Sequence, residues 1–188
     1  MADIYTHLGD FEQSKEYQQR ALKIRLDKLG PEQVDVATRY NNFADICNHL
    51  CDFDQANEYQ QRCLKIRLEK LGPEHVKVAT SCNNLADIYK QQGDLQQAEE
   101  YQQRALRITL DKLGPEHVHV ATSYNNLAAI YQDLGDLEQA KEYQQRALKI
   151  TLDKPGPEHV LQAFLDTGLP RGNRCEGDKG PMQGAFPT

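Results

Sequence analysis

The chain has 188 residues, with 22 Lys or Arg against 28 Asp or Glu, which gives a formal net charge of −6 at pH 7. This balance excludes the basic footprint of a typical nucleic-acid-binding protein. No apolar run reaches the ~20 residues of a membrane-spanning helix, and the first residues lack the basic and apolar regions of a secretory signal. We therefore expect a cytoplasmic protein, and association with the cytoskeleton stays open. We expect neither nucleic acid nor a membrane to be its partner.

The sequence repeats itself with a period of 42 residues. Residues 76–117 align without gaps with residues 118–159 and differ at only 10 of the 42 positions. Residues 34–75 fit the same frame, and residues 1–33 begin part-way through an earlier copy. A fixed period in this range is typical of arrays in which each unit packs on its neighbours. We therefore predict a partial repeat followed by three complete ones, with a different segment at residues 160–188.

Each unit contains two predicted helices, which are clearest in the last copy. Helix A is expected over roughly Val120–Leu134, where apolar residues recur at steps of three and four. Gly135 ends this helix, and Asp136 caps helix B, which runs from Leu137 to about Lys154 with the same spacing. The Gly-Pro-Glu segment at residues 114–116 separates one unit from the next, because Pro cannot continue a helix.

The last segment, residues 160–188, loses the repeat and contains five Gly and three Pro. We expect it to be disordered. Neither end of the predicted array carries a polar capping helix, and solenoids need such caps for solubility. We therefore expect either a fragment of a longer array or ends that associate with each other or with a partner.

The repeating unit resembles a tetratricopeptide repeat. The residues that carry the resemblance are Asn126-Leu127-Ala128, Tyr131, Gly135-Asp136, Ala140, Tyr143 and Ala147-Leu148. With its longer period and the segments VATSYNNLA and LGPEHV, the unit is similar to the repeats of kinesin light chains and of related nephrocystin and NTPase-linked proteins. The resemblance implies an all-α, right-handed superhelical solenoid of antiparallel helix pairs that acts as a non-catalytic, protein-binding scaffold.

Three alternatives stay open at this stage. The chain could be a cargo-binding adaptor of the kinesin light chain type, although the heptad segment that joins heavy chains is not seen here. It could be the repeat arm of a larger NTPase signalling protein. It could also be a truncated gene product, because the register is lost abruptly at Val160.

In arrays of this family the A helices line a concave groove, so their polar positions are the candidate peptide-binding site. These positions are Asn42, Asn84, Asn126, Asp45, Asp87, Thr80 and Thr122. An Asn side chain both donates and accepts hydrogen bonds, so a column of Asn can read the main chain of a peptide. The alternative is that this Asn ties adjacent helices together. The Asp residues disfavour acidic ligands, which predicts a neutral or basic peptide.

The cysteines occupy packing or turn positions rather than a metal site. Cys47, Cys63 and Cys82 replace Tyr or Ala of the other units, and Cys51 replaces the Gly at the end of helix A. Cys at the packing positions is expected to act as a small hydrophobe. Cys51 is expected to strain its turn if φ is positive there. We predict no metal and no cofactor.

The remaining motifs indicate structure rather than catalysis. His75 and His117 recur one period apart, whereas a catalytic group is needed only once. No phosphate-binding loop or hydrolase motif occurs, so we predict no catalytic residues. The repeated Glu-Tyr-Gln-Gln-Arg segment of helix B, for example Glu142–Arg146, is interpreted as a solvated outer face.

Overall fold

The computed structural model describes residues 34–152, together with residues 13, 16–17, 20 and 24. The rest of the predicted partial repeat, the end of the last helix B near Lys154 and the predicted disordered tail lie outside the described residues. Residues 34–152 form helices joined by short turns. The helices are α3 (Val34–His49), α4 (Phe53–Leu71), α5 (Val76–Gln92), α6 (Leu95–Leu113), α7 (Val118–Leu134) and α8 (Leu137–Leu152).

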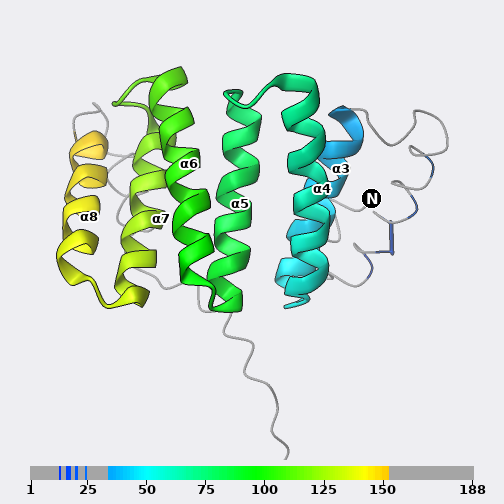
Figure 1. Ribbon diagram of the computed structural model, residues 1–188, viewed down its shortest axis with the longest axis horizontal. Helices are drawn as coiled ribbons and strands as arrows, with labels where there is room; N and C mark the ends of the chain where they lie inside the picture. The colour runs from blue at the N-terminus through cyan, green and yellow to red at the C-terminus, as the bar shows by residue number, and fades with distance from the viewer. Residues whose placement is uncertain (1–12, 14–15, 18–19, 21–23, 25–33, 153–188) are drawn as a thin grey trace, which may run out of the picture.

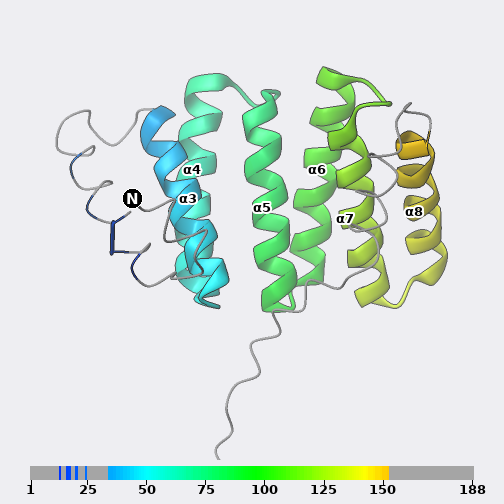
Figure 2. The same ribbon diagram turned by 180° about the vertical axis from the view of Figure 1, so that it is seen from behind.

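The helices stand side by side in chain order and are connected alternately at their two ends (Figures 1 and 2). Helices α3 and α4, α5 and α6, and α7 and α8 pack as pairs, and α4 and α6 pack on the pair that follows. The predicted all-α solenoid of antiparallel helix pairs is confirmed. We call α3, α5 and α7 the A helices, and α4, α6 and α8 the B helices. None of these described helices is long and apolar enough to cross a bilayer.

The turn from an A helix to a B helix is set by a glycine and an aspartate. Gly93 adopts the left-handed conformation with φ 83°, and the next residue, Asp94, donates its backbone N–H to Tyr89 O at 2.9 Å. The Asp94 side chain then accepts from Gln97 N at 3.1 Å, which caps α6. Gly135 and Asp136 form the same turn between α7 and α8, as the sequence predicts.

Cys51 forms this turn without glycine. Its φ is 60°, its N–H donates to Asn48 O at 3.1 Å, and Asp52 N donates to Cys47 O at 2.9 Å. These are the hydrogen bonds that the glycine turns make. An L-residue with a Cβ adopts the left-handed region at a cost of about 1–2 kcal/mol, so the turn after α3 is strained, as expected.

Histidines cap the N-termini of two A helices, α5 and α7. His75 Nδ1 accepts from Lys77 N at 3.1 Å, and His117 Nδ1 accepts from His119 N at 3.2 Å. Because of this cap, α7 begins at Val118, two residues earlier than the apolar spacing predicts. The recurring histidines therefore have a structural role, at helix N-termini.

The core repeats one contact at each junction between pairs, where two leucines of a B helix pack with a Val-Ala pair of the next A helix. The groups are Leu64 and Leu68 with Val78 and Ala79, and Leu106 and Leu110 with Val120 and Ala121. Cys47, Cys63 and Cys82 are buried thiols within this core. Burial raises the pKa of the Cys82 thiol to about 11, against a smaller lowering by Arg104.

The Glu-Tyr-Gln-Gln-Arg segment is only partly an outer face, so its interpretation as a solvated surface is wrong for two of the described copies. Gln60 and Gln102, the first Gln of the segment in α4 and α6, are buried. Tyr101 of the same segment stacks on Tyr89 with ring centroids 5.5 Å apart. The Glu and Arg of the segment do lie on the surface, where Arg146 pairs with Glu142 one turn away.

Candidate functional site

Polar side chains link successive A helices along one face of the array. Asn48 Nδ2 of α3 donates to Asp87 Oδ2 of α5 at 3.0 Å. Lys90 Nζ of α5 lies 3.8 Å from Asp133 Oδ2 of α7. We call the surface that carries these contacts the A-helix face.

The junction between α3 and α5 is closed by a buried hydrogen-bond network. Asn41 Oδ1 accepts from Asn84 Nδ2 at 3.1 Å, from Gln60 Nε2 at 3.4 Å and from Arg67 Nη1 at 3.5 Å. Arg67 Nη1 also donates to Ser81 Oγ at 2.7 Å. Because buried polar groups are stable only when they are hydrogen-bonded, this shared acceptor fixes the position of α5 against α3 and α4.

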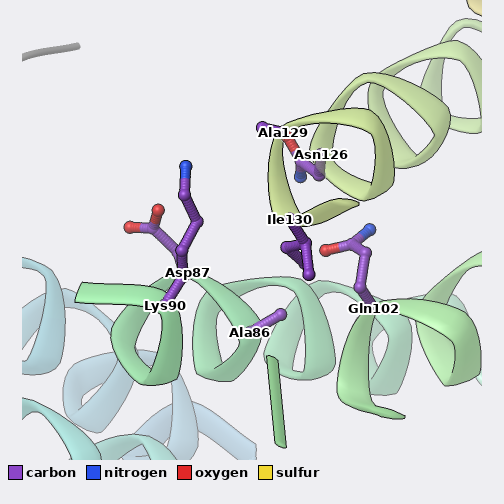
Figure 3. Close-up of a pocket in the computed structure, with 7 residues that line it drawn as sticks. All are labelled: Ala86, Asp87, Lys90, Gln102, Asn126, Ala129 and Ile130. Carbon is purple, nitrogen blue, oxygen red and sulfur yellow. The ribbon is translucent and has the colours of Figure 1, made fainter. Parts of the chain in front are cut away.

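The junction between α5 and α7 is open and forms a cleft of about 40 Å³ (Figure 3). It is lined by Ala86, Asp87, Lys90, Gln102, Asn126, Ala129 and Ile130. Gln102 reaches into the cleft from α6, with its carboxamide directed toward Ile130 (Figure 3). Its Nε2 donates to Asn83 Oδ1 at 2.7 Å, whereas its Oε1 is buried and accepts no hydrogen bond.

Sequence differences between the repeats explain why this second junction is open. The Asn48–Asp87 hydrogen bond of the first junction corresponds to Lys90 and Ala129 one period later, and an alanine cannot accept it. Arg67 of the network corresponds to Thr109, whose hydroxyl donates to Ala105 O of its own helix at 3.0 Å. The cleft therefore lies where three linking side chains, Asn48, Asp87 and Arg67, are replaced one period later.

The cleft combines a carboxylate, an ammonium group and two carboxamides with apolar walls. Such a set can hydrogen-bond to a peptide main chain and select side chains by charge. Lys90 faces Asp133, which partly compensates its charge, whereas Asp87 accepts from the neutral amide of Asn48. Over the described residues there is no group of three or more His, Cys, Asp or Glu that could hold a metal ion.

The predicted site residues divide between cleft, network and surface. Asp87 and Asn126 line the cleft, from α5 and α7. Asn84 donates to Asn41, so its amide links two A helices, which is the alternative role considered for this column. Asn42 is half-buried on α3 and Asp45 is exposed there, outside the cleft.

The two predicted threonines are exposed, but their hydroxyls turn back to their own helices. Thr80 Oγ1 donates to Val76 O at 3.3 Å, and Thr122 Oγ1 donates to Val118 O at 3.2 Å. Peptide contact by any of the seven predicted residues remains a prediction.

Sequence reasoning missed Lys90, Gln102, Ala86 and Ile130 of the cleft. The loss of Asp at position 129, in a column that holds Asp45 and Asp87, was the available signal for an open junction. For Gln102 the available signal was its spacing, four residues after Ala98 and three before Ala105, which places it on the buried side of α6 although it belongs to a polar segment.

Known proteins and structures share this architecture. The tetratricopeptide repeat family matches residues 1–69, 40–111, 78–153 and 119–168. The crystal structure of BtubC (BKLC) from P. vanneervenii is 31% identical in sequence, with a TM-score of 0.76 over 89% of this chain and 67% of that one. No curated protein sequence matches the chain.

A second similar structure has the same helical fold at lower identity. It is a putative kinesin light chain from Podosopora anserina with nearly identical TPR-like repeats, 22% identical, with a TM-score of 0.73 over 89% of this chain and 83% of that one. The family matches span most of the sequence, and paired helices with a 42-residue period fill the described part. The chain therefore belongs to the tetratricopeptide repeat family.

Proposed function

We propose that this chain is a cytoplasmic, non-catalytic scaffold that binds an extended peptide of a partner protein along the A-helix face, with the α5–α7 cleft as the central contact. The observation that carries the proposal is the open cleft between α5 and α7, where Asp87 and Asn126 lie beside the buried Oε1 of Gln102. This Oε1 accepts no hydrogen bond, as is also true of Gln60 Oε1 at the first junction, but only at the second junction does a cleft adjoin it. A peptide N–H entering the cleft, with a small shift of the Gln102 side chain, would supply the missing donor.

The charge of the A-helix face favours a neutral or basic peptide. Asp45 and Asp87 are exposed on α3 and α5, and the hydrogen-bond partner of Asp87 is the neutral amide of Asn48. An acidic ligand would meet like charge on these helices, which disfavours its approach. The selectivity is measured with arrays of basic, neutral and acidic peptides, and a preference for acidic peptides contradicts it.

The cleft is tested by affinity purification with mass spectrometry on the full chain and on two variants. Asn126→Ala removes a cleft carboxamide that makes no hydrogen bond to another side chain within residues 34–152. We therefore expect this variant to lose the partner proteins while it retains the fold. Lys149→Ala, exposed on α8, is the matched control and should recover the same partners as the unmodified chain. If Asn126→Ala recovers every partner in unchanged yield, the cleft is not the binding site.

A second candidate function is a cargo-binding adaptor of the kinesin light chain type. It is supported by the fold shared with the putative kinesin light chain repeats, and it would give the protein a cytoskeletal association. Recovery of a kinesin heavy chain in the same purification would favour this function, and its absence from all baits would favour the general scaffold.

A further inference from the structure

The outer side of α8 carries an exposed apolar stripe. Leu137, Leu148 and Leu152 are 70%, 48% and 55% exposed. Spacings of eleven and four residues place all three on one side of the helix. Lys141 and Gln145, both exposed, lie between them. We call these five residues the α8 outer face.

The preceding B helices show what covers this stripe elsewhere in the array. Leu106 and Leu110 of α6, which correspond to Leu148 and Leu152, pack with Val120 and Ala121 of α7. Leu64 and Leu68 of α4 pack with the same residue types of α5. At both junctions, therefore, a Val-Ala pair of an A helix covers the two leucines of a B helix.

Polar side chains beside these leucines also form hydrogen bonds between each B helix and the A helix that covers it. Tyr131 of α7 donates its hydroxyl to Glu99 Oε1 of α6 at 2.6 Å, and Gln61 Nε2 of α4 donates to the Tyr89 hydroxyl of α5 at 3.1 Å. Lys141 corresponds to Glu99, and Gln145 corresponds to Gln61. Both are donors on α8, so a covering helix that presents an acceptor, such as a tyrosine hydroxyl or a carboxylate, would complement them.

We infer that the α8 outer face binds an amphipathic helix of another polypeptide, with a Val-Ala pair against Leu148 and Leu152 and an oxygen acceptor near Lys141 and Gln145. This surface is separate from the A-helix face and serves a second partner. The contact repeats the packing of α7 on α6 across a boundary between chains.

A second copy of this chain is a poorer occupant than a helix of different sequence. Its α3 helix carries a Val-Ala pair, but Val36, Ala37 and Tyr40 are buried within the chain itself. Packing α8 on α8 would place leucines against leucines and supply an extra ammonium group from the other Lys141 instead of an acceptor. The donors of the face are therefore matched better by a different helix.

The test uses a fluorescently labelled peptide with the sequence of residues 118–134, the helix that covers α6. Anisotropy titration with the full chain should give saturable binding. Replacing both Leu148 and Leu152 by Lys should weaken it by about tenfold or more, because two apolar contacts are lost at exposed positions that tolerate charge. Lys65→Glu, at the equivalent exposed position of α4 and therefore outside the α8 outer face, is the control and should leave binding unchanged.

Two results overturn the inference. One is the absence of saturable binding, or binding that the double Leu→Lys variant does not weaken. The other is sedimentation showing that the chain dimerises and that the same variant makes it monomeric, since the occupant is then a second copy. Asn126→Ala should not change the titration, so the outcome is independent of the peptide-binding proposal for the cleft.

Discussion

Replacing Cys51 by Gly should stabilise the protein. Cys51 holds φ at 60° and makes the hydrogen bonds that Gly93 makes at φ 83°. Relieving the left-handed conformation is worth about 1–2 kcal/mol, and the larger chain entropy of glycine in the unfolded state offsets about 0.5–1 kcal/mol of it. We therefore expect the free energy of unfolding to rise by about 0.5–1 kcal/mol and the Tm by about 1–4 °C.

Urea denaturation followed by circular dichroism measures this change, with excess reductant present so that only the turn differs between the proteins. The reciprocal variant Gly93→Ala is the control. A Cβ at Gly93 would meet no atom within 4 Å, so any loss of stability comes from φ alone. The expected loss is about 1 kcal/mol. If Cys51→Gly destabilises the protein while Gly93→Ala leaves it unchanged, the account of this turn is wrong.

Three further predictions concern the cap, the network and the buried thiol. His75→Ala should lower the free energy of unfolding by about 1 kcal/mol in urea denaturation, and His75→Asn should restore most of the loss by capping the helix again. Asn41→Ala removes an acceptor shared by three donors and should cost about 2–3 kcal/mol, whereas Asn126→Ala should cost less than about 0.5 kcal/mol. Because the pKa of the Cys82 thiol is raised in the folded state, its contribution to stability is complete below pH 9 and is lost as the pH rises toward 11. Cys82→Ala should therefore flatten the alkaline decline of the free energy of unfolding, and an unchanged decline would contradict this.

The repeat period, the paired helices and the glycine turns could be predicted from the sequence because each depends on residues close along the chain. The apolar spacing locates a helix, and Gly135 with Asp136 marks its end, without knowledge of the partner helix. The start of α7 was placed two residues late because a His cap has no strong sequence signal, unlike Ser, Thr, Asp or Asn.

The candidate site was less predictable because it depends on which side chains meet across junctions. Asn84 and Asn126 occupy the same place in their repeats, but Asn84 bonds to Asn41 and Asn126 lines an open cleft. The difference comes from residues elsewhere, namely Lys90 and Ala129 in place of Asn48 and Asp87. Aligning the copies shows these substitutions, but only the packed array shows that they face each other.

Because the junction between α3 and α5 and the junction between α5 and α7 differ in their polar contacts, we expect the helix pairs to separate in a preferred order. At the first boundary three side chains donate to Asn41. The second boundary has no such shared acceptor among its described residues: it holds leucine contacts, the Tyr131–Glu99 hydrogen bond and the Lys90–Asp133 pair beside a cleft. In a linear array each boundary can separate by itself, so the α7–α8 pair should detach first and its amides should exchange with deuterium faster than those of α4 and α5. The array would then have a rigid part at α3–α5 and a part at α7–α8 that opens more readily. A peptide bound in the cleft would slow amide hydrogen exchange chiefly in α7 and α8.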